Sequence, residues 1–258
     1  MLLLFDGPEI LCGRFTLRTN PVVWGQLFLP GWSADEIKQR AEALGLKPRF
    51  NIAPTQSIAC IHRSEIGGPR QLTLFRWGLL PPWADDLAIG AKMINARSET
   101  LDQKRSFQSA FASQRCLVPM DGYYEWSVRN GAKQPFLIEP SSSEPLVMAG
   151  LWQLNKKLGR DGEPVFSVTV ITTAANKTTQ SIHDRMPVFL PESAHDQWLD
   201  PGFADTDTLT QWLVPAPDDL LVARPVAKTV GSVRIDDERC VQPATPDDTP
   251  RQGLLFDD

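Results

Sequence analysis

Short apolar segments without regularly spaced helices between them constrain the possible fold most strongly. These segments are rich in apolar or β-branched residues and are mostly bounded by Gly, Pro or Asn, which is typical of β-strands. They cover residues 57–62, 72–77, 116–120, 135–138, 146–151, 165–172 and 220–225. The pair Asn130-Gly131 favours a tight turn between two of them. Because helices do not alternate with these strands, the sequence predicts an α+β fold with mainly antiparallel sheets.

Helices are expected at a few places between the strands. Ser33 and Glu36 form a capping-box pattern that opens the first helix, and Gly45 can end it. Further helices are predicted over residues 98–114, 191–199 and 207–213. The buried stripe of the longest one is expected to contain Leu101, Phe107 and Phe111.

The domain boundaries follow from composition. A chain of 258 residues can bury a large core, and no change in composition divides it before about residue 242. We therefore expect one folded domain over residues 12–242 and a disordered acidic tail over 243–258. No apolar run approaches the roughly 18 residues of a membrane span, and residues 1–11 make a poor signal peptide. A cytoplasmic location is expected, without membrane contact.

The cysteines and the net charge exclude some classes of site. Cys12, Cys60, Cys116 and Cys240 are widely separated, which argues against a zinc site and a disulfide framework. Cys116 lies in an apolar run and is expected in the core. The net charge of −5 is unlike the basic footprint of many nucleic-acid-binding proteins, although acidic residues concentrate in the tail. No metal and no nucleotide cofactor are predicted.

Chemically reactive residues occur in motifs that lie far apart in the sequence. A thiol, an amide, a carboxyl and an imidazole each stand beside an arginine or an aromatic residue. Covalent chemistry on an anionic substrate requires groups of these kinds. The motifs are Cys12-Gly13-Arg14-Phe15, Asn95-Ala96-Arg97-Ser98-Glu99-Thr100, Gly122-Tyr123-Tyr124-Glu125-Trp126 and Ile182-His183-Asp184-Arg185-Met186-Pro187.

In this order, the motifs resemble those of the SOS-response-associated peptidases, whose members crosslink themselves to abasic sites in single-stranded DNA. The resemblance extends from Cys12 to about Pro243, and it includes Asn51-Ile52-Ala53-Pro54 and Phe75-Arg76-Trp77-Gly78. It implies a single domain in which mainly antiparallel sheets form an open barrel-like core with flanking helices. It also implies localisation with the nucleoid.

The resemblance assigns roles at matching positions. The reactive cysteine, amide, carboxyl and histidine of the family correspond to Cys12, Asn95, Glu125 and His183. Its phosphate-binding arginines correspond to Arg97 and Arg185.

Two departures from the family accompany this match. The segment Val230-Gly231-Ser232-Val233 matches, but Ile235 stands where the family usually has an amide, which places the local turn in question. In the family the cysteine is the first residue of the mature protein, whereas residues 1–11 precede Cys12 here. We expect this segment to be removed by autocleavage, or to be absent because translation begins at Leu11.

The chemistry of an N-terminal cysteine explains why its position matters. An α-amine has a pKa of about 7.7–8.0, against about 10.4 for lysine, so much more of it is unprotonated at neutral pH. It can condense with the aldehyde of an abasic deoxyribose to form an imine, and the neighbouring thiol can then close a thiazolidine ring. An internal Cys12 has no free amine and cannot react in this way. The open alternative is that Cys12 is a core cysteine at the start of a strand.

The other reactive side chains suit supporting roles. Glu125 lies among aromatic residues, and an apolar surrounding raises a carboxyl pKa, so that Glu125 can act as an acid. His183 has a side chain whose ordinary pKa, near 6.5, suits proton shuttling. Asn95 can position an amine or a sugar hydroxyl without carrying charge. The alternative for Glu125 is an exposed carboxylate on a strand, and the alternative for His183 is a structural histidine. His62 and His195 are predicted to be structural histidines.

Candidate DNA contacts are arginines and apolar residues. Arg14, Arg97 and Arg185 offer planar guanidinium groups to phosphates. Pro54 and Trp83 are candidates for wedging or stacking against bases, with Trp83 as an exposed platform. Trp77 ends an apolar strand and is expected in the core.

These residues support a main interpretation and two rivals. The first is covalent sensing of abasic sites in single-stranded DNA, with autopeptidase and lyase chemistry. The second is a thiol peptidase or hydrolase that acts on peptide bonds, and the third is a DNA-binding module without chemistry. A covalent adduct, peptide turnover in trans, or reversible binding alone distinguishes the three.

The tail suggests a protein partner. Gln252, Leu255 and Phe256 resemble the short peptide by which bacterial proteins bind the replicative sliding clamp. The alternative is a tail that packs on its own domain. A second match, Gln71-Leu72-Thr73-Leu74-Phe75, lies in a predicted core strand and shows how readily such pentapeptides arise.

Overall fold

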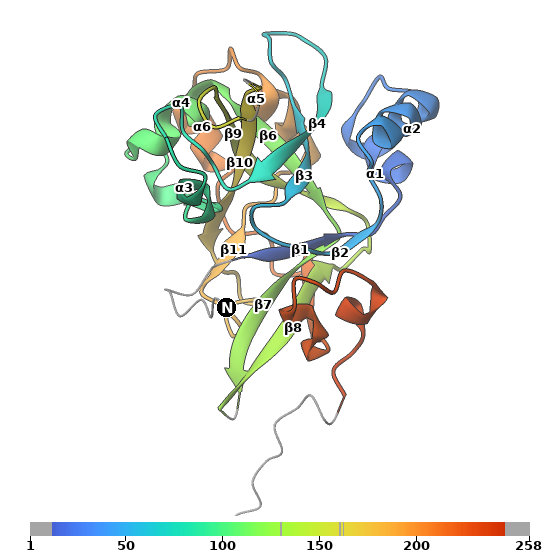
Figure 1. Ribbon diagram of the computed structural model, residues 1–258. Helices are drawn as coiled ribbons and strands as arrows, with labels where there is room; N and C mark the ends of the chain where they lie inside the picture. Colours follow the sequence, from blue (N-terminus) through green and yellow to red (C-terminus); the bar gives the residue numbers. More distant parts are fainter. Residues whose placement is uncertain (1–11, 130, 160, 162, 246–258) are drawn as a thin grey trace, which may run out of the picture.

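A closed five-stranded barrel forms the upper part of the protein (Figure 1). The structure is a computed structural model, and it describes residues 12–129, 131–159, 161 and 163–245. The ring runs β10-β4-β3-β6-β9 and returns to β10, because β9 pairs with both β6 and β10. Its strands are β3 (Ser57–His62), β4 (Gln71–Trp77), β6 (Arg115–Met120), β9 (Leu146–Asn155) and β10 (Val165–Ala174). All neighbours in the ring are antiparallel except β4 and β10.

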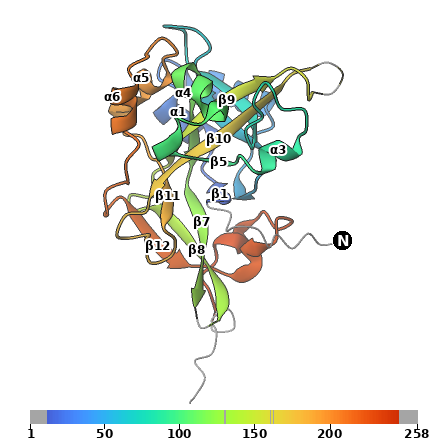
Figure 2. The ribbon, with the colours of Figure 1, turned by 90° about the vertical axis from the view of Figure 1, so that its left-hand side faces the viewer.

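The strand β10 changes partners along its length. Its first half lies between β9 and β4, whereas its second half lies between the short strands β5 (Asn95–Arg97) and β11 (Arg185–Pro187). Figure 2 shows β5 and β11 beside β10, close to the start of β1. The end of β10 therefore brings together two segments that are 90 residues apart in the sequence (95 and 185).

A second sheet lies beneath the barrel in Figure 1. It is antiparallel throughout, in the order β12-β8-β7-β1-β2. Its strands are β1 (Arg14–Leu17), β2 (Arg49–Ile52), β7 (Gly122–Arg129), β8 (Ala132–Pro140) and β12 (Leu221–Pro225). The Phe15 ring of β1 lies 5.3 Å from that of Trp77, which joins this sheet to the barrel.

Helices flank the barrel. They are α1 (Pro21–Phe28), α2 (Ala34–Ala43), α3 (Ala88–Ala91), α4 (Arg105–Ser113), α5 (His195–Leu199) and α6 (Thr206–Gln211). Short 3-10 turns are η1 (Ser98–Thr100), η2 (Glu192–Ala194), η3 (Lys228–Gly231) and η4 (Glu238–Val241). In the described part of the chain, no helix has the length and apolar character needed to cross a membrane.

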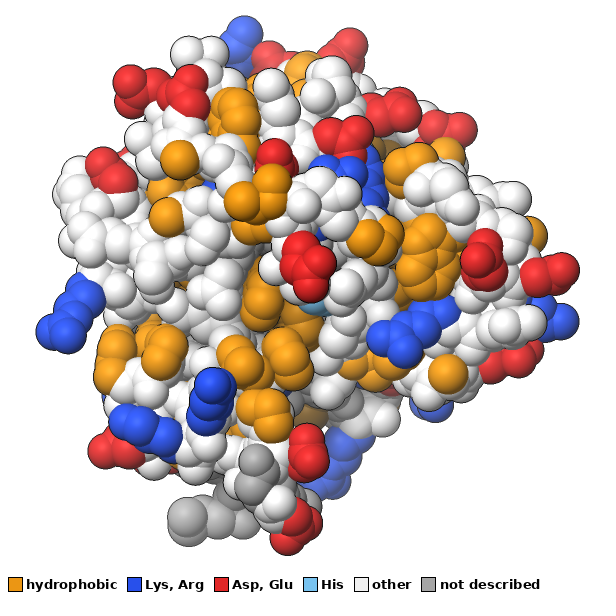
Figure 3. Space-filling view, turned by 90° about the horizontal axis from the view of Figure 1, so that it is seen from above, with side chains coloured by type: hydrophobic (Ala, Val, Ile, Leu, Met, Phe, Trp, Pro, Cys, Tyr) orange, Lys and Arg blue, Asp and Glu red, His pale blue; other side chains and the backbone are white. Residues whose placement is uncertain are grey.

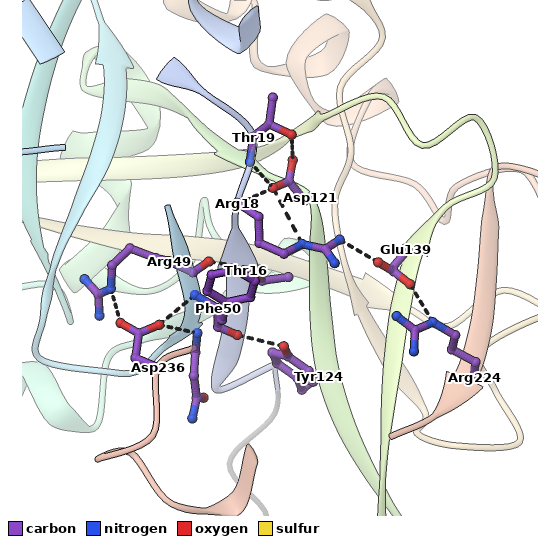
Figure 4. A network of polar contacts seen from close by, with 11 residues as sticks. Thr16, Arg18, Thr19, Arg49, Phe50, Asp121, Tyr124, Glu139, Arg224 and Asp236 are labelled. Atoms are coloured by element: carbon purple, nitrogen blue, oxygen red, sulfur yellow. Dashed lines mark hydrogen bonds and ion pairs between the residues drawn. The ribbon is translucent and has the colours of Figure 1, made fainter. Parts of the chain in front are cut away.

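Polar contacts fix the second sheet to the segment that follows β12 (Figure 4). Asp236 accepts hydrogen bonds from the backbone N–H groups of Phe50 (2.6 Å) and Asn51 (2.8 Å). On the other side of β1, Asp121 accepts from the backbone N–H (2.8 Å) and hydroxyl (2.8 Å) of Thr19. Asp236 thereby ties β2 to the segment after β12, and Asp121 holds the residues that follow β1.

The expected fold class is confirmed: the chain forms one α+β domain with mainly antiparallel sheets and a barrel core, although the barrel is closed and not open as expected, because β9 pairs with both β6 and β10. The capping box of α2 is also present, with Ser33 N–H donating to the Glu36 carboxylate at 2.7 Å. The expected core positions of Trp77 and Cys116 are confirmed, and both side chains are buried.

Some predicted boundaries are wrong. The expected helix over 98–114 is divided into η1 and α4, because Lys104 adopts an extended backbone and begins α4. Its apolar stripe is nevertheless buried, as expected. The helix over 191–199 is likewise divided, into η2 and α5, and the helix over 207–213 begins and ends earlier, as α6. Strands β1, β2, β5, β7 and β11 and helices α1 and α3 were not predicted.

Candidate active site

The backbone nitrogen of Cys12 lies against the carboxylate of Glu125. Pairing of β1 with β7 sets Arg14 opposite Tyr124, which brings Glu125 alongside the residues just before β1. The Cys12 N–H donates to Glu125 Oε1 at 2.7 Å, and both residues are buried. Cys12 has a φ of 44°, in the left-handed backbone region that residues other than glycine rarely adopt. The nitrogen that would become the α-amine therefore already contacts a carboxylate.

The surroundings of the Cys12 thiol keep it protonated. Burial raises its pKa well above the ordinary value, and the charge of Glu125 and a hydrogen bond to Glu125 act in the same direction. The positive charge of Arg185 opposes these effects. A thiolate is the nucleophilic form of cysteine, so this thiol is not prepared for direct attack in the way that a thiol hydrolase requires.

The amide and arginine of the second motif lie on β5. Parallel pairing with β10 sets Asn95 opposite Val170 and Arg97 opposite Thr172. The Asn95 side chain is half-buried, whereas Arg97 is exposed. Asn95 and Arg97 are two residues apart on β5, so they lie on the same face of the strand, opposite the buried Ala96.

His183 lies in the turn that leads into β11. Its Nδ1 is 3.1 Å from the backbone N–H of Arg185 and 2.9 Å from Asp184 Oδ1. A neutral ring can accept at Nδ1 from Arg185, whereas a protonated ring can donate there to Asp184. Both protonation states therefore have a partner, which suits proton transfer.

Arg185 is buried, and both of its terminal nitrogens donate hydrogen bonds. They donate to the two Glu99 oxygens at 2.5 and 2.9 Å and to the Thr172 carbonyl at 2.7 Å. In this structure the guanidinium fork that we expected to bind phosphate is bound to a carboxylate of the same protein.

Arg14 also contacts protein groups. Its Nη1 donates to Asn51 Oδ1 and to the Val230 carbonyl, both at 2.8 Å, and its guanidinium lies 5.9 Å from the Trp126 ring centroid. Burial lowers its pKa. The structure thus places Arg14 as a tie between β1 and the segment after β12.

Asn51, which accepts from Arg14, also holds the turn around Ile235. Asn51 Nδ2 donates to the carbonyls of Val230 (3.1 Å), Ser232 (3.0 Å) and Ile235 (2.8 Å). The contact uses the backbone carbonyl of residue 235, and the Ile235 side chain packs against the apolar cluster that contains Tyr124 and Leu137, so the turn forms with isoleucine at this position.

The two apolar candidates differ in exposure. Pro54 is half-buried after β2, and Trp83 is 50% exposed, as expected for a platform. Trp83 lines a cavity of about 530 Å³ together with Pro82, Arg105 and Gln153. Among the side chains coloured in Figure 3, Lys and Arg are interspersed with Asp and Glu over the face seen from above.

Sequence reasoning did not assign two nearby residues within the quoted motifs. Tyr123 shares its β7 face with Glu125 and is buried, and its pKa is raised by burial and then by the charges of Cys12 and Glu125. Glu99 lies between Arg185 and Arg97, both of which lower its pKa. The position of Tyr123 two residues before Glu125 was a usable signal, whereas nothing local indicated the partner of Glu99.

The described residues contain no group of three or more His, Cys, Asp or Glu side chains arranged to hold a metal ion. The Cys12 thiol and nitrogen lie against the Glu125 carboxyl, while the His183 imidazole lies in the turn before β11 and the Asn95 amide lies on β5.

Comparison with known proteins places these residues in a family context. The model of the SOS response associated peptidase (SRAP) family matches residues 11–233. The abasic site processing protein YoqW of Bacillus subtilis is 38% identical over 223 residues, covering 86% of this chain and 95% of that protein. The abasic site processing protein YedK of Escherichia coli is 28% identical over 236 residues, covering 90% of this chain and 100% of that protein.

Solved structures share the fold. A protein from Bacteroides thetaiotaomicron superposes with a TM-score of 0.76 at 24% identity, covering 91% of this chain and 100% of that one. A protein from Bordetella bronchiseptica gives a TM-score of 0.65 at 28% identity, with 84% and 100% coverage.

Proposed function

Because the chain belongs to the SOS response associated peptidase family, we propose that it processes abasic sites in single-stranded DNA by forming a covalent link through Cys12. Relatives named abasic site processing proteins support this assignment. The observation that carries it is the 2.7 Å contact between the Cys12 nitrogen and Glu125 Oε1.

The proposed reaction begins at the α-amine of an N-terminal Cys12. The amine adds to the aldehyde carbon of the opened deoxyribose, and the carbinolamine loses its hydroxyl as water to give an imine. The Cys12 sulfur then adds to the imine carbon, and its proton passes to the nitrogen. Amine, thiol and aldehyde thus become a thiazolidine and one water, with no redox step.

Glu125 is placed to move the protons in this sequence. As a carboxylate it accepts a proton from the attacking nitrogen, and as an acid it donates one to the departing hydroxyl. His183, with a partner for either protonation state, can exchange protons with the sugar, and Asn95 can orient it. The raised thiol pKa is compatible with this order, because the amine attacks first.

Exposure of Cys12 is part of the proposal. One route is autocleavage of the bond between residues 11 and 12, in which water is consumed and the Cys12 nitrogen leaves with a proton supplied by Glu125. Residues 1–11 lie outside the described part of the chain. The other route is a translation start at Leu11 followed by removal of the initiating methionine.

The first prediction is that the protein isolated from cells begins at Cys12. Intact-mass measurement should give the mass of residues 12–258. A mass that includes residues 1–11 would contradict both routes, and the Glu125→Gln variant separates them. If autocleavage is the route, the variant should keep residues 1–11, because the cleavage needs Glu125. If translation begins at Leu11, the variant should still begin at Cys12.

A thiol peptidase that acts in trans is the second candidate. The family name favours it, but the raised pKa of the Cys12 thiol does not. Incubation with abasic single-stranded DNA and, separately, with unstructured peptides tests the two. A heat-stable adduct without peptide turnover supports the proposal, whereas turnover without an adduct would replace it. Reversible binding of the DNA, without an adduct and without peptide turnover, would indicate a DNA-binding module without chemistry.

The sliding clamp remains a proposed partner. Gln252, Leu255 and Phe256 lie outside the described residues, so the argument rests on the sequence alone. Such a tether would raise the local concentration of the protein at replication forks and so associate it with the nucleoid.

The second prediction concerns this tail. A peptide of residues 246–258 should bind the clamp at tens of micromolar or tighter, and a Leu255→Ala, Phe256→Ala peptide should bind at least about tenfold more weakly, because two apolar anchors are removed. Fluorescence anisotropy measures both. Equal binding of the two peptides would rule out the clamp assignment.

A further inference from the structure

The contact between Glu99 and Arg185 joins a fixed cation to a replaceable anion. The Arg185 side chain is only 9% exposed, and its Nη2 donates to the Thr172 carbonyl of β10 at 2.7 Å. The Glu99 side chain is 52% exposed and belongs to the short turn η1. The arginine is therefore anchored in the fold, while the outer side of the carboxylate faces solvent.

The geometry of this pair is that of anion recognition. Both Glu99 oxygens accept from Arg185, in the parallel two-bond arrangement that guanidinium groups form with carboxylates and phosphates alike. The exposed Arg97 also acts electrostatically on Glu99. Two arginines, at positions expected to contact phosphates, thus act on one carboxylate of the protein, Arg185 through hydrogen bonds and Arg97 through its charge.

The pair is also connected to the reactive centre. The Arg185 backbone N–H donates to His183 Nδ1, and the Arg185 charge acts on the Cys12 thiol. Loss of any anion from Arg185 would leave a buried, unpaired guanidinium, which is costly. An anion is needed there at all times, but it need not be Glu99.

We propose that Glu99 occupies the place of a DNA phosphate on Arg185, and that single-stranded DNA binds by replacing this carboxylate with a backbone phosphate. The inference rests on the proposed function, because it concerns the same DNA site. Exchange keeps Arg185 paired in both states, and the released Glu99 carboxylate becomes hydrated at the surface.

The exchange has a consequence for selectivity. Every strand that binds must displace an internal competitor, so weak isolated anions are rejected and strands with several phosphate contacts are favoured. Glu99 would thereby lower the affinity for DNA while it keeps the site assembled between encounters.

The third prediction follows from this exchange. Glu99→Gln keeps the size of the side chain but removes the competing charge, so binding to single-stranded DNA without an abasic site should tighten by about tenfold at low salt. The slope of log K against log salt should change by less than about 0.7, the value for one phosphate contact on a single strand, because Arg185 contacts a phosphate in the bound state of either protein. Anisotropy titrations over a salt series measure both quantities.

Controls separate a local exchange from a general change in charge. Glu144→Gln removes an equal charge from an exposed residue between β8 and β9, and it should leave affinity within about twofold. In an Arg185→Lys background, which keeps the charge but not the two-bond fork, Glu99→Gln should gain less than about threefold. Thermal melting of each variant confirms folding.

The possible outcomes separate this inference from the proposed function. Unchanged or weaker binding by Glu99→Gln would show that Glu99 only positions Arg185, and the inference would be wrong while the proposed function stands. An equal gain from Glu144→Gln, or the full gain in the Arg185→Lys background, would also overturn it. If the unaltered protein formed no complex and no adduct with single-stranded DNA, both the proposed function and the inferred exchange of Glu99 would be wrong.

Discussion

Replacement of Cys12 by alanine is expected to abolish the heat-stable adduct with abasic single-stranded DNA, with a loss of at least about 1,000-fold in rate, the scale seen when a covalent nucleophile is removed. The variant keeps the α-amine once residue 12 is exposed, so an imine can still form, but no ring can close. Binding to single-stranded DNA should persist, because no phosphate contact is altered. Gel electrophoresis after heating measures the adduct, and anisotropy measures binding.

Two further variants sharpen this result. Cys12→Ser should give at most an imine, which borohydride traps and heating destroys. Cys240→Ala is the matched control, since Cys240 is also a free, buried cysteine but lies in a separate apolar cluster with Tyr124 and Leu137. It should form the adduct at the unaltered rate. A heat-stable adduct of Cys12→Ala would contradict the thiazolidine assignment.

Replacement of Glu125 by glutamine should slow adduct formation by about 10²- to 10⁴-fold, the range in which a positioned general acid or base contributes. Glutamine keeps the shape and can still accept from the Cys12 nitrogen, but it cannot take up or deliver a proton. Glu144→Gln again serves as the control. Single-turnover kinetics of adduct formation measure the rate.

The same substitution separates two roles of the carboxylate. Glu125 raises the Cys12 thiol pKa, so its removal should lower that pKa and shift pH-dependent alkylation of Cys12 to lower pH. If thiolate formation limited the reaction, Glu125→Gln would accelerate it. A slower adduct together with a more acidic thiol would show that proton transfer by Glu125, and not thiol ionisation, controls the rate.

The sequence predicted those elements whose signals are local. The capping box of α2 and the strand β3 could be identified because each is specified by neighbouring residues. Strands β5 and β11 could not, since each has three residues and exists only through pairing with β10. Strand β7 begins with glycine and places Glu125 on a buried face, so its pattern is not the usual alternation. The break between η1 and α4 depends on the backbone of Lys104, which no apolar period reveals.

Much the same limit applies to the site. The sequence identified Cys12, Asn95, Glu125 and His183 as a set, and the fold now provides the contact between the first and third. It could not show that Arg14 and Arg185 are engaged by protein groups, because their partners lie far away in the chain, at Val230 and Glu99. Charged side chains with long-range partners carry no local signature of the pairing.

The most direct test of the account is peptide mass spectrometry of the protein after reaction with an abasic oligonucleotide and nuclease digestion. The account predicts one modified peptide that begins at Cys12 and carries the deoxyribose remnant with the loss of one water, stable to heating without borohydride. A modification on a lysine, or on a peptide that still contains residues 1–11, would contradict the claim that an exposed Cys12 forms the crosslink.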